Sequence, residues 1–433
     1  MDKEEYPSER LHPTASRQKW LIFMCFMAYT VSYLTRYSYN SNIVAIREAY
    51  EVSRAEAGLV GTFYFFAYGI GQVVNGILCK RYNKKWCIAG ALATSAIVNF
   101  ILFFSPTFSI YKWLWLVNGI ALSFLWTSLL SILSENLDDC YLGRAVLIMS
   151  LSIPTGTCLS YGSGALFNLF DIYHYEFLLV SVIAILFVFA WIFTYDGLVK
   201  TSQSKVVRQE ENTVDTATSI QIKTDSYSFS NIVLVFVLPG ILILIENLVK
   251  DGLNTWVPEI LKTTFGYPNE LSIALTIGLP LIGMLGSTLA LALNKKIKDY
   301  LLLSGVLYTV ATLCVGIIVG IMFGRETGVF FGILMVVVFC ILSLFMYSIN
   351  SVMTSIIPMF LRDRYNTGMV AGVLNGCGYV GSTLSSYGLG LLADREGWDG
   401  VFILLLALSI SGMLIGLLAP LIVNVIRQER TKS

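Results

Sequence analysis

The chain has 433 residues, of which 56% are hydrophobic and only 13% are charged, and its formal net charge is +1. This composition argues against a soluble globular domain and is typical of a protein that crosses a lipid bilayer many times. The near-zero net charge argues against nucleic acid as a partner.

Twelve stretches have the length and apolar character of membrane-spanning helices, which need about 20 mostly apolar residues each. They are centred on residues 20–43, 56–79, 86–105, 110–134, 143–170, 175–195, 230–257, 270–293, 300–324, 327–355, 365–391 and 399–426. The predicted fold class is therefore an all-α membrane protein with twelve transmembrane helices.

The longest polar stretch, residues 200–230, separates six predicted helices from six others. It is rich in Ser, Thr, Gln and charges of both signs, which is typical of a linker. The predicted domains are a cytoplasmic N-terminus, an N-terminal six-helix half, a cytoplasmic linker, a C-terminal six-helix half and a cytoplasmic C-terminus, at 1–19, 20–195, 196–229, 230–427 and 428–433. Two six-helix halves around a central loop are the plan of the major facilitator fold, in which substrate binds between the halves.

Basic residues in short loops indicate which side of the membrane each loop faces. The loop after the second predicted helix reads KRYNKKW, the loop after the eighth reads NKKIKDY, and further Lys and Arg residues flank both chain ends. With twelve spans, all of them fall on one side. We therefore expect both termini to be cytoplasmic, in a multi-pass protein of the plasma (inner) membrane.

The first predicted helix contains the stretch AYTVSYLTRYSYNSN, in which an arginine stands among tyrosines. Tyr29, Tyr33, Arg36 and Asn40 are spaced so that they share one helical face. A charged side chain at the bilayer centre costs roughly 2.5–3.5 kcal/mol on insertion scales. We therefore predict that Arg36 faces a hydrated cavity and holds an anionic substrate; the alternative is that it extends to the membrane interface.

Three other predicted helices carry polar stripes at helical spacing. They are Tyr64, Tyr68 and Gln72 in the second helix, Tyr347, Asn350, Ser351 and Thr354 in the tenth, and Asn375, Tyr379, Ser382 and Ser386 in the eleventh. Each stripe alone could serve helix packing. Together with the first helix, they predict that several polar faces line one cavity.

The seventh predicted helix contains the stretch LIENLVKDGLNTWVP. Glu246 and Lys250 are spaced i, i+4, in the orientation that favours a helical ion pair, and so are Asn247 and Asp251. The pair could serve only to neutralise two buried charges. The functional alternative is a switch, in which a substrate anion competes for Lys250 or a proton neutralises Glu246. Lys250 and Arg36, one from each half, would then clamp an anion, with Glu246 and Asp251 as candidate coupling residues.

The chain resembles the organophosphate:phosphate antiporters of the major facilitator superfamily, which include glycerol-phosphate and hexose-phosphate transporters. The resemblance covers most of the chain and is most specific in YLTRYSYN, AYGIGQVVNGIL, KDGLNTWVPEIL and GYVGSTLSSYGLGLLADREGWDGVF. It implies that Arg36 and Lys250 bind substrate phosphate from the two halves. It also implies that tyrosines line the cavity, at Tyr29, Tyr33, Tyr68, Tyr347 and Tyr379.

The chain departs from the family pattern at several positions. Gln72 stands where the family has a second-helix lysine, Lys80 replaces a loop aspartate, and Thr155 lies roughly where glycerol-phosphate transporters have a histidine. Lys250 replaces an arginine, which keeps the charge but loses the bidentate fork, and Glu246 adds an acid. The cavity is thus less positive than a dianionic phosphate ester would require, and a monoanionic, zwitterionic or sugar-like substrate remains an alternative.

We therefore expect a secondary active transporter of a small organic anion, such as a sugar phosphate or glycerol phosphate, that works by alternating access. Phosphate would be the counter-substrate, or a proton the co-substrate. The alternative transporter is a proton-coupled symporter of a non-phosphorylated sugar, sugar acid or other small metabolite. A ligand sensor with the same fold is a further alternative. The sequence contains no GxSxG, HExxH or phosphate-cradling glycine loop, so we expect no enzyme, catalytic residue, metal or cofactor, and a monomer is sufficient.

Overall fold

The computed structural model describes residues 15–78, 81–105, 107–199, 236–324, 328–361 and 367–432, and it is helical almost throughout, with no strand in these ranges. The predicted all-α fold is therefore confirmed. The helices before residue 200 are α1 (Ala15–Ser41), α2 (Ile43–Tyr50), α3 (Arg54–Leu78), α4 (Lys84–Phe103), η1 (Phe108–Ile110), α5 (Tyr111–Leu122), α6 (Leu125–Asn136), α7 (Asp139–Leu169) and α8 (Tyr175–Leu198).

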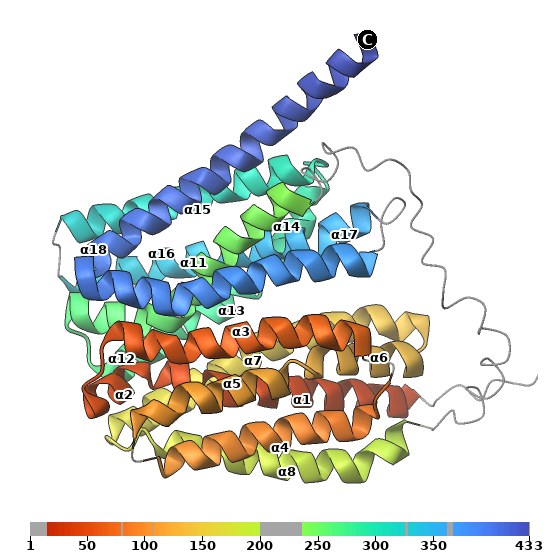
Figure 1. Ribbon diagram of the computed structural model, residues 1–433, viewed down its shortest axis with the longest axis vertical. Helices are drawn as coiled ribbons and strands as arrows, with labels where there is room; N and C mark the ends of the chain where they lie inside the picture. The colour runs from red at the N-terminus through yellow and green to blue at the C-terminus, as the bar shows by residue number, and fades with distance from the viewer. Residues whose placement is uncertain are drawn as a thin grey trace, which may run out of the picture.

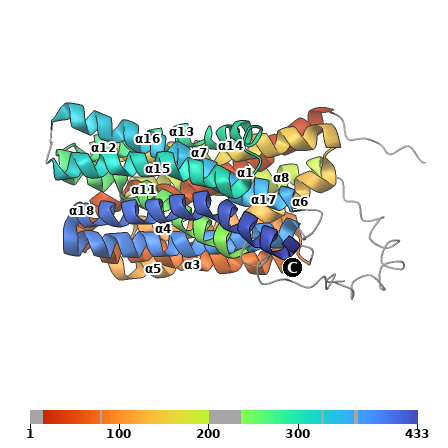
Figure 2. The same ribbon diagram turned by 90° about the horizontal axis from the view of Figure 1, so that it is seen from above.

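The helices after residue 235 form a second group. They are α11 (Leu238–Phe265), α12 (Asn269–Thr276), α13 (Gly278–Gly283), α14 (Gly286–Asn294), α15 (Tyr300–Phe323), α16 (Val329–Ser351), η3 (Val352–Ile356), α17 (Ile357–Phe360) and α18 (Thr367–Lys432). Figure 1 shows the two groups as separate bundles, with α1–α8 below and α11–α18 above, and Figure 2 shows the helices of both running in the same general direction. We call these bundles the N-half and the C-half.

The described residues contain nine helical segments that are long and apolar enough to cross a membrane. One of them, Met369–Ala419, includes both arms of α18, which bends at Gly397, where φ is 70°. Such a backbone conformation favours glycine. The predicted eleventh and twelfth spans correspond to these two arms. The nine segments do not include α1 and α11, which carry the charged residues predicted to bind substrate.

The predicted boundaries are wrong for the seventh span, because α11 continues to Phe265 and not to residue 257. Pro258 lies inside the helix, as membrane helices allow where neighbouring helices compensate for the lost hydrogen bond. The next turn contains Glu259, whose charge is paired with arginines of the N-half. The helix ends at Gly266, which takes the left-handed conformation typical of a helix C-terminus. Residues 230–235 of the predicted span lie outside the described ranges.

The predicted fourth and eighth spans are each broken into shorter helices, α5–α6 and α12–α13–α14. The breaks in the eighth span lie around Pro280, Gly278 and Gly286. Proline removes a backbone donor and glycine weakens a helix. Gly283 and Gly286 also sit against the Tyr347 side chain, where a Cβ atom would collide. The breaks therefore let this span pack closely on α16.

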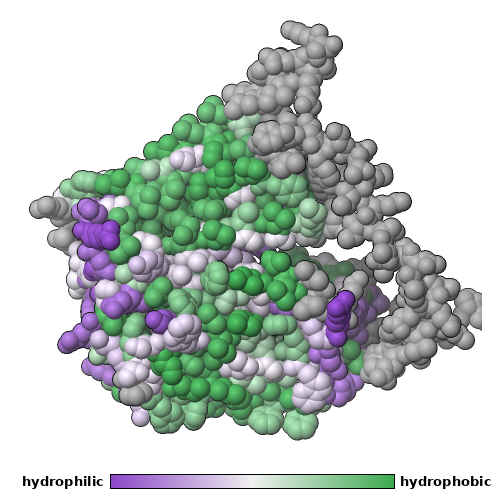
Figure 3. Space-filling view, viewed as in Figure 1, coloured by the Kyte–Doolittle hydropathy of each residue, from purple (hydrophilic) through white to green (hydrophobic). Residues whose placement is uncertain are grey.

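The halves touch at one end and separate toward the other. We call the end where α8 stops and α11 begins the linker end, and the opposite end the α2–α12 end. The space-filling view in Figure 3 shows a hollow between the halves toward the linker end, whereas the surface is continuous at the α2–α12 end. Green apolar side chains cover the middle of the visible face and purple polar ones gather at its two ends, as expected for a protein embedded in lipid.

Candidate functional site

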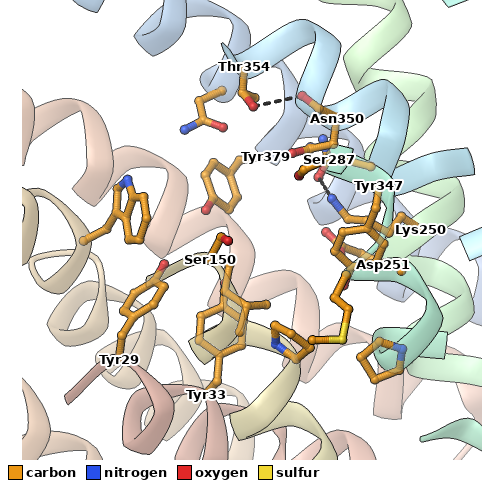
Figure 4. Close-up of a pocket in the computed structure, with 18 of the residues that line it drawn as sticks. Tyr29, Tyr33, Ser150, Lys250, Asp251, Ser287, Tyr347, Asn350, Thr354 and Tyr379 are labelled. Atoms are coloured by element: carbon orange, nitrogen blue, oxygen red, sulfur yellow. Dashed lines mark hydrogen bonds between the residues drawn. The ribbon is translucent and has the colours of Figure 1, made fainter. Parts of the chain in front are cut away.

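A cavity of about 380 Å³ lies between the halves and is large enough for a small metabolite. All nine predicted substrate-binding residues line it: Arg36, Lys250, Tyr29, Tyr33, Tyr68, Gln72, Tyr347, Asn375 and Tyr379. Asp251 also lines it. Figure 4 shows Tyr29 and Tyr33 of the N-half on one side, and Lys250 and Asp251 of the C-half on the other. Contact of these residues with a substrate stays a prediction.

Arg36 occupies the N-half wall of the cavity in an aromatic cage. Its side chain is held by α1 and only 8% of the residue is exposed. Five rings surround its Cζ atom, with centroids 4.7 to 5.5 Å away: Tyr33, Tyr37, Tyr64, Phe65 and Tyr68. Cation–π contacts of this kind contribute about 0.5–2 kcal/mol each. They hold the positive charge in place without neutralising it.

The guanidinium of Arg36 keeps donors for a ligand. Its one hydrogen bond in the described ranges is a long one, from Nη1 to the Tyr33 hydroxyl at 3.5 Å. No ion pair joins it to any acid in those ranges. An arginine has five N–H donors in a fork that matches phosphate or carboxylate oxygens. A nearly buried arginine without a carboxylate partner is costly, so an anion entering the cavity would gain a strong partner here.

Lys250, on the C-half wall, is already neutralised. Its Nζ atom lies 3.1 Å from Glu246 Oε1 and donates to Asn247 Oδ1 at 2.8 Å. Glu246 is fully buried behind the cavity wall, and its Oε2 accepts from Asn247 at 2.7 Å and from Asn350 at 3.0 Å. The predicted ion pair is thus confirmed. The two cations are not equivalent, however, because only Arg36 lacks an acid partner.

Asp251 lies next to this pair on the cavity wall. Its Oδ2 accepts a hydrogen bond from the Ser382 hydroxyl at 2.5 Å. It forms no ion pair with any described residue, and it is 7% exposed. The C-half wall therefore carries one cation and two acids, whereas the N-half wall carries one cation.

Five residues of the predicted polar stripes do not line the cavity: Asn40, Tyr64, Ser351, Ser382 and Ser386. Two of them are the last residues of their stripes. Asn40 donates to the Thr255 hydroxyl at 3.0 Å, and Ser386 packs against Gly58 and Gly61 of α3. Both belong to the contact between the halves, because a polar helical face continues from the cavity into the interface. Thr155 is half-buried and also lies outside the cavity lining; the lining of α7 comes from Ser150, Ile153 and Pro154.

Sequence reasoning missed several residues of the site. Tyr37 stacks on Tyr33, with ring centroids 5.9 Å apart, and completes the cage together with Phe65. Tyr37 is four residues after Tyr33, so the helical spacing contained the signal. Trp126, from α6, contacts the Tyr29 ring at 4.9 Å. No polar pattern marks Trp126 or Phe65, because an aromatic residue in a membrane helix faces lipid as often as a cavity.

A network of charges closes the α2–α12 end. Glu259 of α11 is 1% exposed and pairs with Arg47 of α2 and with Arg54 of α3, the latter at 2.8 Å. Asp394 of α18 also pairs with Arg54, at 3.5 Å, and accepts from the Ala55 N–H at 2.8 Å. Further contacts cross between the halves from Lys262 to Glu48, from Asn269 to Asn168 and from Tyr161 to the Asn254 carbonyl. All of them must break for this end to open.

We expect Glu259→Gln to open the α2–α12 end. The substitution leaves Arg47 and Arg54 without their shared carboxylate, and hydrogen bonds to charged groups contribute about 1.5–3 kcal/mol. The ratio of open to closed molecules should rise roughly tenfold to 150-fold, since 1.4 kcal/mol is a factor of ten. Double electron–electron resonance between spin labels at the exposed residues Glu51 and Glu396 measures the distance between the two halves at this end. Glu135→Gln, which breaks a pair with Lys84 inside the N-half, is the control. An unchanged distance distribution in Glu259→Gln would show that the ion pairs of Glu259 do not hold this end closed.

The fold and the cavity define a membrane transporter with two halves around a central site. The model of the Major Facilitator Superfamily matches residues 25–386, so the chain belongs to this superfamily. A crystal structure of a D-xylose–proton symporter superposes with a TM-score of 0.70 at 13% identity, over 91% of this chain and 97% of that one, which shows the shared fold.

Two relatives are informative about the branch of the superfamily. Sugar phosphate exchanger 3 of Gallus gallus is 23% identical over 86% of this chain and 79% of its own length. The membrane sensor protein UhpC of Escherichia coli (strain K12) is 27% identical, but over only 24% of this chain and 23% of its own length. The resemblance to the organophosphate:phosphate antiporters is confirmed, and the superfamily and the name of the sugar phosphate exchanger indicate transport.

Proposed function

We propose that the protein transports a small phosphate ester by alternating access, with inorganic phosphate as the counter-substrate. The observation that carries the proposal is Arg36, a nearly buried guanidinium in the central cavity with no carboxylate partner in the described ranges. A fork of N–H donors matches the oxygens of a phosphate group. The name of the sugar phosphate exchanger supports the same substrate class.

The transport cycle follows from the two ends of the cavity. In this conformation substrate enters from the linker end, and its phosphate oxygens accept hydrogen bonds from Arg36 and from tyrosine hydroxyls such as Tyr33 and Tyr68. Lys250 leaves Glu246 and approaches the anion from the C-half. The bound anion attracts Arg36 and Lys250 from the two halves and so favours closure of the cavity at the linker end. The ion pairs at the α2–α12 end then break and release the substrate on the other side.

The orientation in the membrane is part of the proposal. The basic residues of the loops support a cytoplasmic linker and cytoplasmic termini; we propose a plasma-membrane protein that works as a monomer. The two six-helix halves, 20–195 and 230–427, would be the moving units, with the linker between them. The conformation described above is then open to the cytoplasm and closed to the outside.

Exchange in proteoliposomes tests this function. Vesicles that contain only this protein are loaded with unlabelled inorganic phosphate and given labelled glucose 6-phosphate or glycerol 3-phosphate outside. We expect uptake that requires internal phosphate and that a proton ionophore leaves unchanged. Uptake of a neutral sugar or sugar acid, driven by a pH gradient without internal phosphate, would support the proton-coupled symporter instead. Binding without any exchange would favour a sensor, in line with the name of UhpC.

A further inference from the structure

The two walls of the cavity carry opposite net charge. On the C-half wall, the charge of Lys250 is compensated by Glu246 at 3.1 Å, whereas Asp251 forms no ion pair with any described residue. On the N-half wall, Arg36 lines the cavity and forms no ion pair with any described acid. The formal charge is therefore +1 on one wall and −1 on the other. A ligand that carries charges of both signs can match both walls, whereas a ligand that is only anionic matches the first wall alone.

Asp251 has the geometry of a ligand contact and not of a structural ion pair. It lines the cavity, and its Oδ2 atom is held by the Ser382 hydroxyl at 2.5 Å. That single neutral donor fixes the direction of the carboxylate but adds no positive charge. The side chain of Lys250 is engaged elsewhere, by Glu246 and Asn247. A carboxylate that is only 7% exposed favours a cationic partner over a hydroxyl, because hydrogen bonds between ionised groups are the stronger ones.

We propose that the substrate is a zwitterionic phosphate ester, whose phosphate binds Arg36 and whose ammonium group binds Asp251. This inference rests on the proposed function and specifies its substrate class. Asp251 would then determine specificity, since its carboxylate attracts an ammonium group and repels a second anionic group at the same place. The polar residues around it, Asn350 and Tyr347, would contact the uncharged middle of the ligand.

A matched set of ligands tests the proposal on the intact protein. Glucosamine 6-phosphate and glucose 6-phosphate differ only in an ammonium group against a hydroxyl, and N-acetylglucosamine 6-phosphate removes the charge while keeping the nitrogen. Phosphoethanolamine and 2-hydroxyethyl phosphate form a smaller pair with the same single difference. Binding is measured by isothermal titration. We expect each ligand with an ammonium group to bind at least tenfold more tightly than its counterpart without one.

The variant Asp251→Asn keeps the shape of the side chain and can still accept from Ser382. It should lose the tenfold preference and bind the phosphate esters without an ammonium group as well as it binds the amines. Asp196→Asn, which removes an acid from an ion pair with Lys85 outside the cavity, should keep the wild-type preference. If Asp251→Asn does not fold, the ligand comparison on the wild type still decides.

The outcomes separate this inference from the proposed function. Equal binding of the amine and its hydroxyl counterpart by the wild type would overturn the zwitterion proposal and leave phosphate-ester transport standing. A preference that survives in Asp251→Asn would overturn the assignment to Asp251. Failure of every phosphate ester to bind would overturn both.

Discussion

Arg36→Gln is expected to abolish binding and transport of phosphate esters. Removing one partner of a poorly hydrated charge pair costs about 2–5 kcal/mol, so the affinity should fall by roughly 30-fold to more than 1,000-fold. Arg36→Lys should keep part of the affinity, since it retains the charge but loses the fork. Titration calorimetry and proteoliposome uptake measure the two effects.

The same variant should still fold and insert. Arg36 pairs with no carboxylate in the described ranges, so its loss strands no buried acid, and only the contacts with the aromatic cage disappear. Arg144→Gln, which removes an exposed arginine of α7 outside the cavity, is the matched control and should bind like the wild type. Full affinity in Arg36→Gln would show that the anion binds elsewhere.

Glu246→Gln and Lys250→Gln are expected to change phosphate affinity in opposite directions. Glu246→Gln frees Lys250 for the ligand, and the glutamine carbonyl can still accept from Asn247 and Asn350. Affinity for inorganic phosphate should therefore rise roughly tenfold to 150-fold, which corresponds to the 1.5–3 kcal/mol typical of a hydrogen bond to a charged group. Lys250→Gln removes a cation and leaves Glu246 buried without its partner, so affinity should fall.

Stability distinguishes the two variants as well. A buried acid that loses its partner costs about 3–5 kcal/mol, so Lys250→Gln should lower the melting temperature of the purified protein. The double variant, which removes both charges, should recover most of the loss. If Glu246→Gln weakens phosphate binding as much as Lys250→Gln does, the pair is a fixed part of the site and not a competitor of the substrate.

The residues that line the cavity could be predicted from the sequence, because polar side chains of a membrane helix are costly in lipid and usually face the interior of the bundle. Arg36 and the tyrosines on its helical face repeat at 3.6 residues, and the cost of exposing them to lipid is large, so spacing alone indicated the face. The pairing of Glu246 with Lys250 was predictable for the same reason, since a local contact on one helix follows from spacing.

What sequence could not predict depends on contacts between distant segments. The compensation of the Lys250 charge by Glu246 and the lack of an acid beside Arg36 make the two walls unequal, and the second fact depends on how α1, α3 and α11 pack. The closing network of Glu259 with Arg47 and Arg54 joins residues more than 200 positions apart in the chain. The extension of α11 past Pro258 depends on that network too, because it compensates the charge in the last turns.

The most direct test of the central claim is whether phosphate esters bind the folded protein through the cavity. Thermal unfolding of the purified protein is followed with inorganic phosphate, phosphate esters, sugar acids and neutral sugars, since a ligand of the native state raises the melting temperature. The account predicts that phosphate esters raise it in the wild type and not in Arg36→Gln. A rise with non-phosphorylated solutes alone would contradict the account.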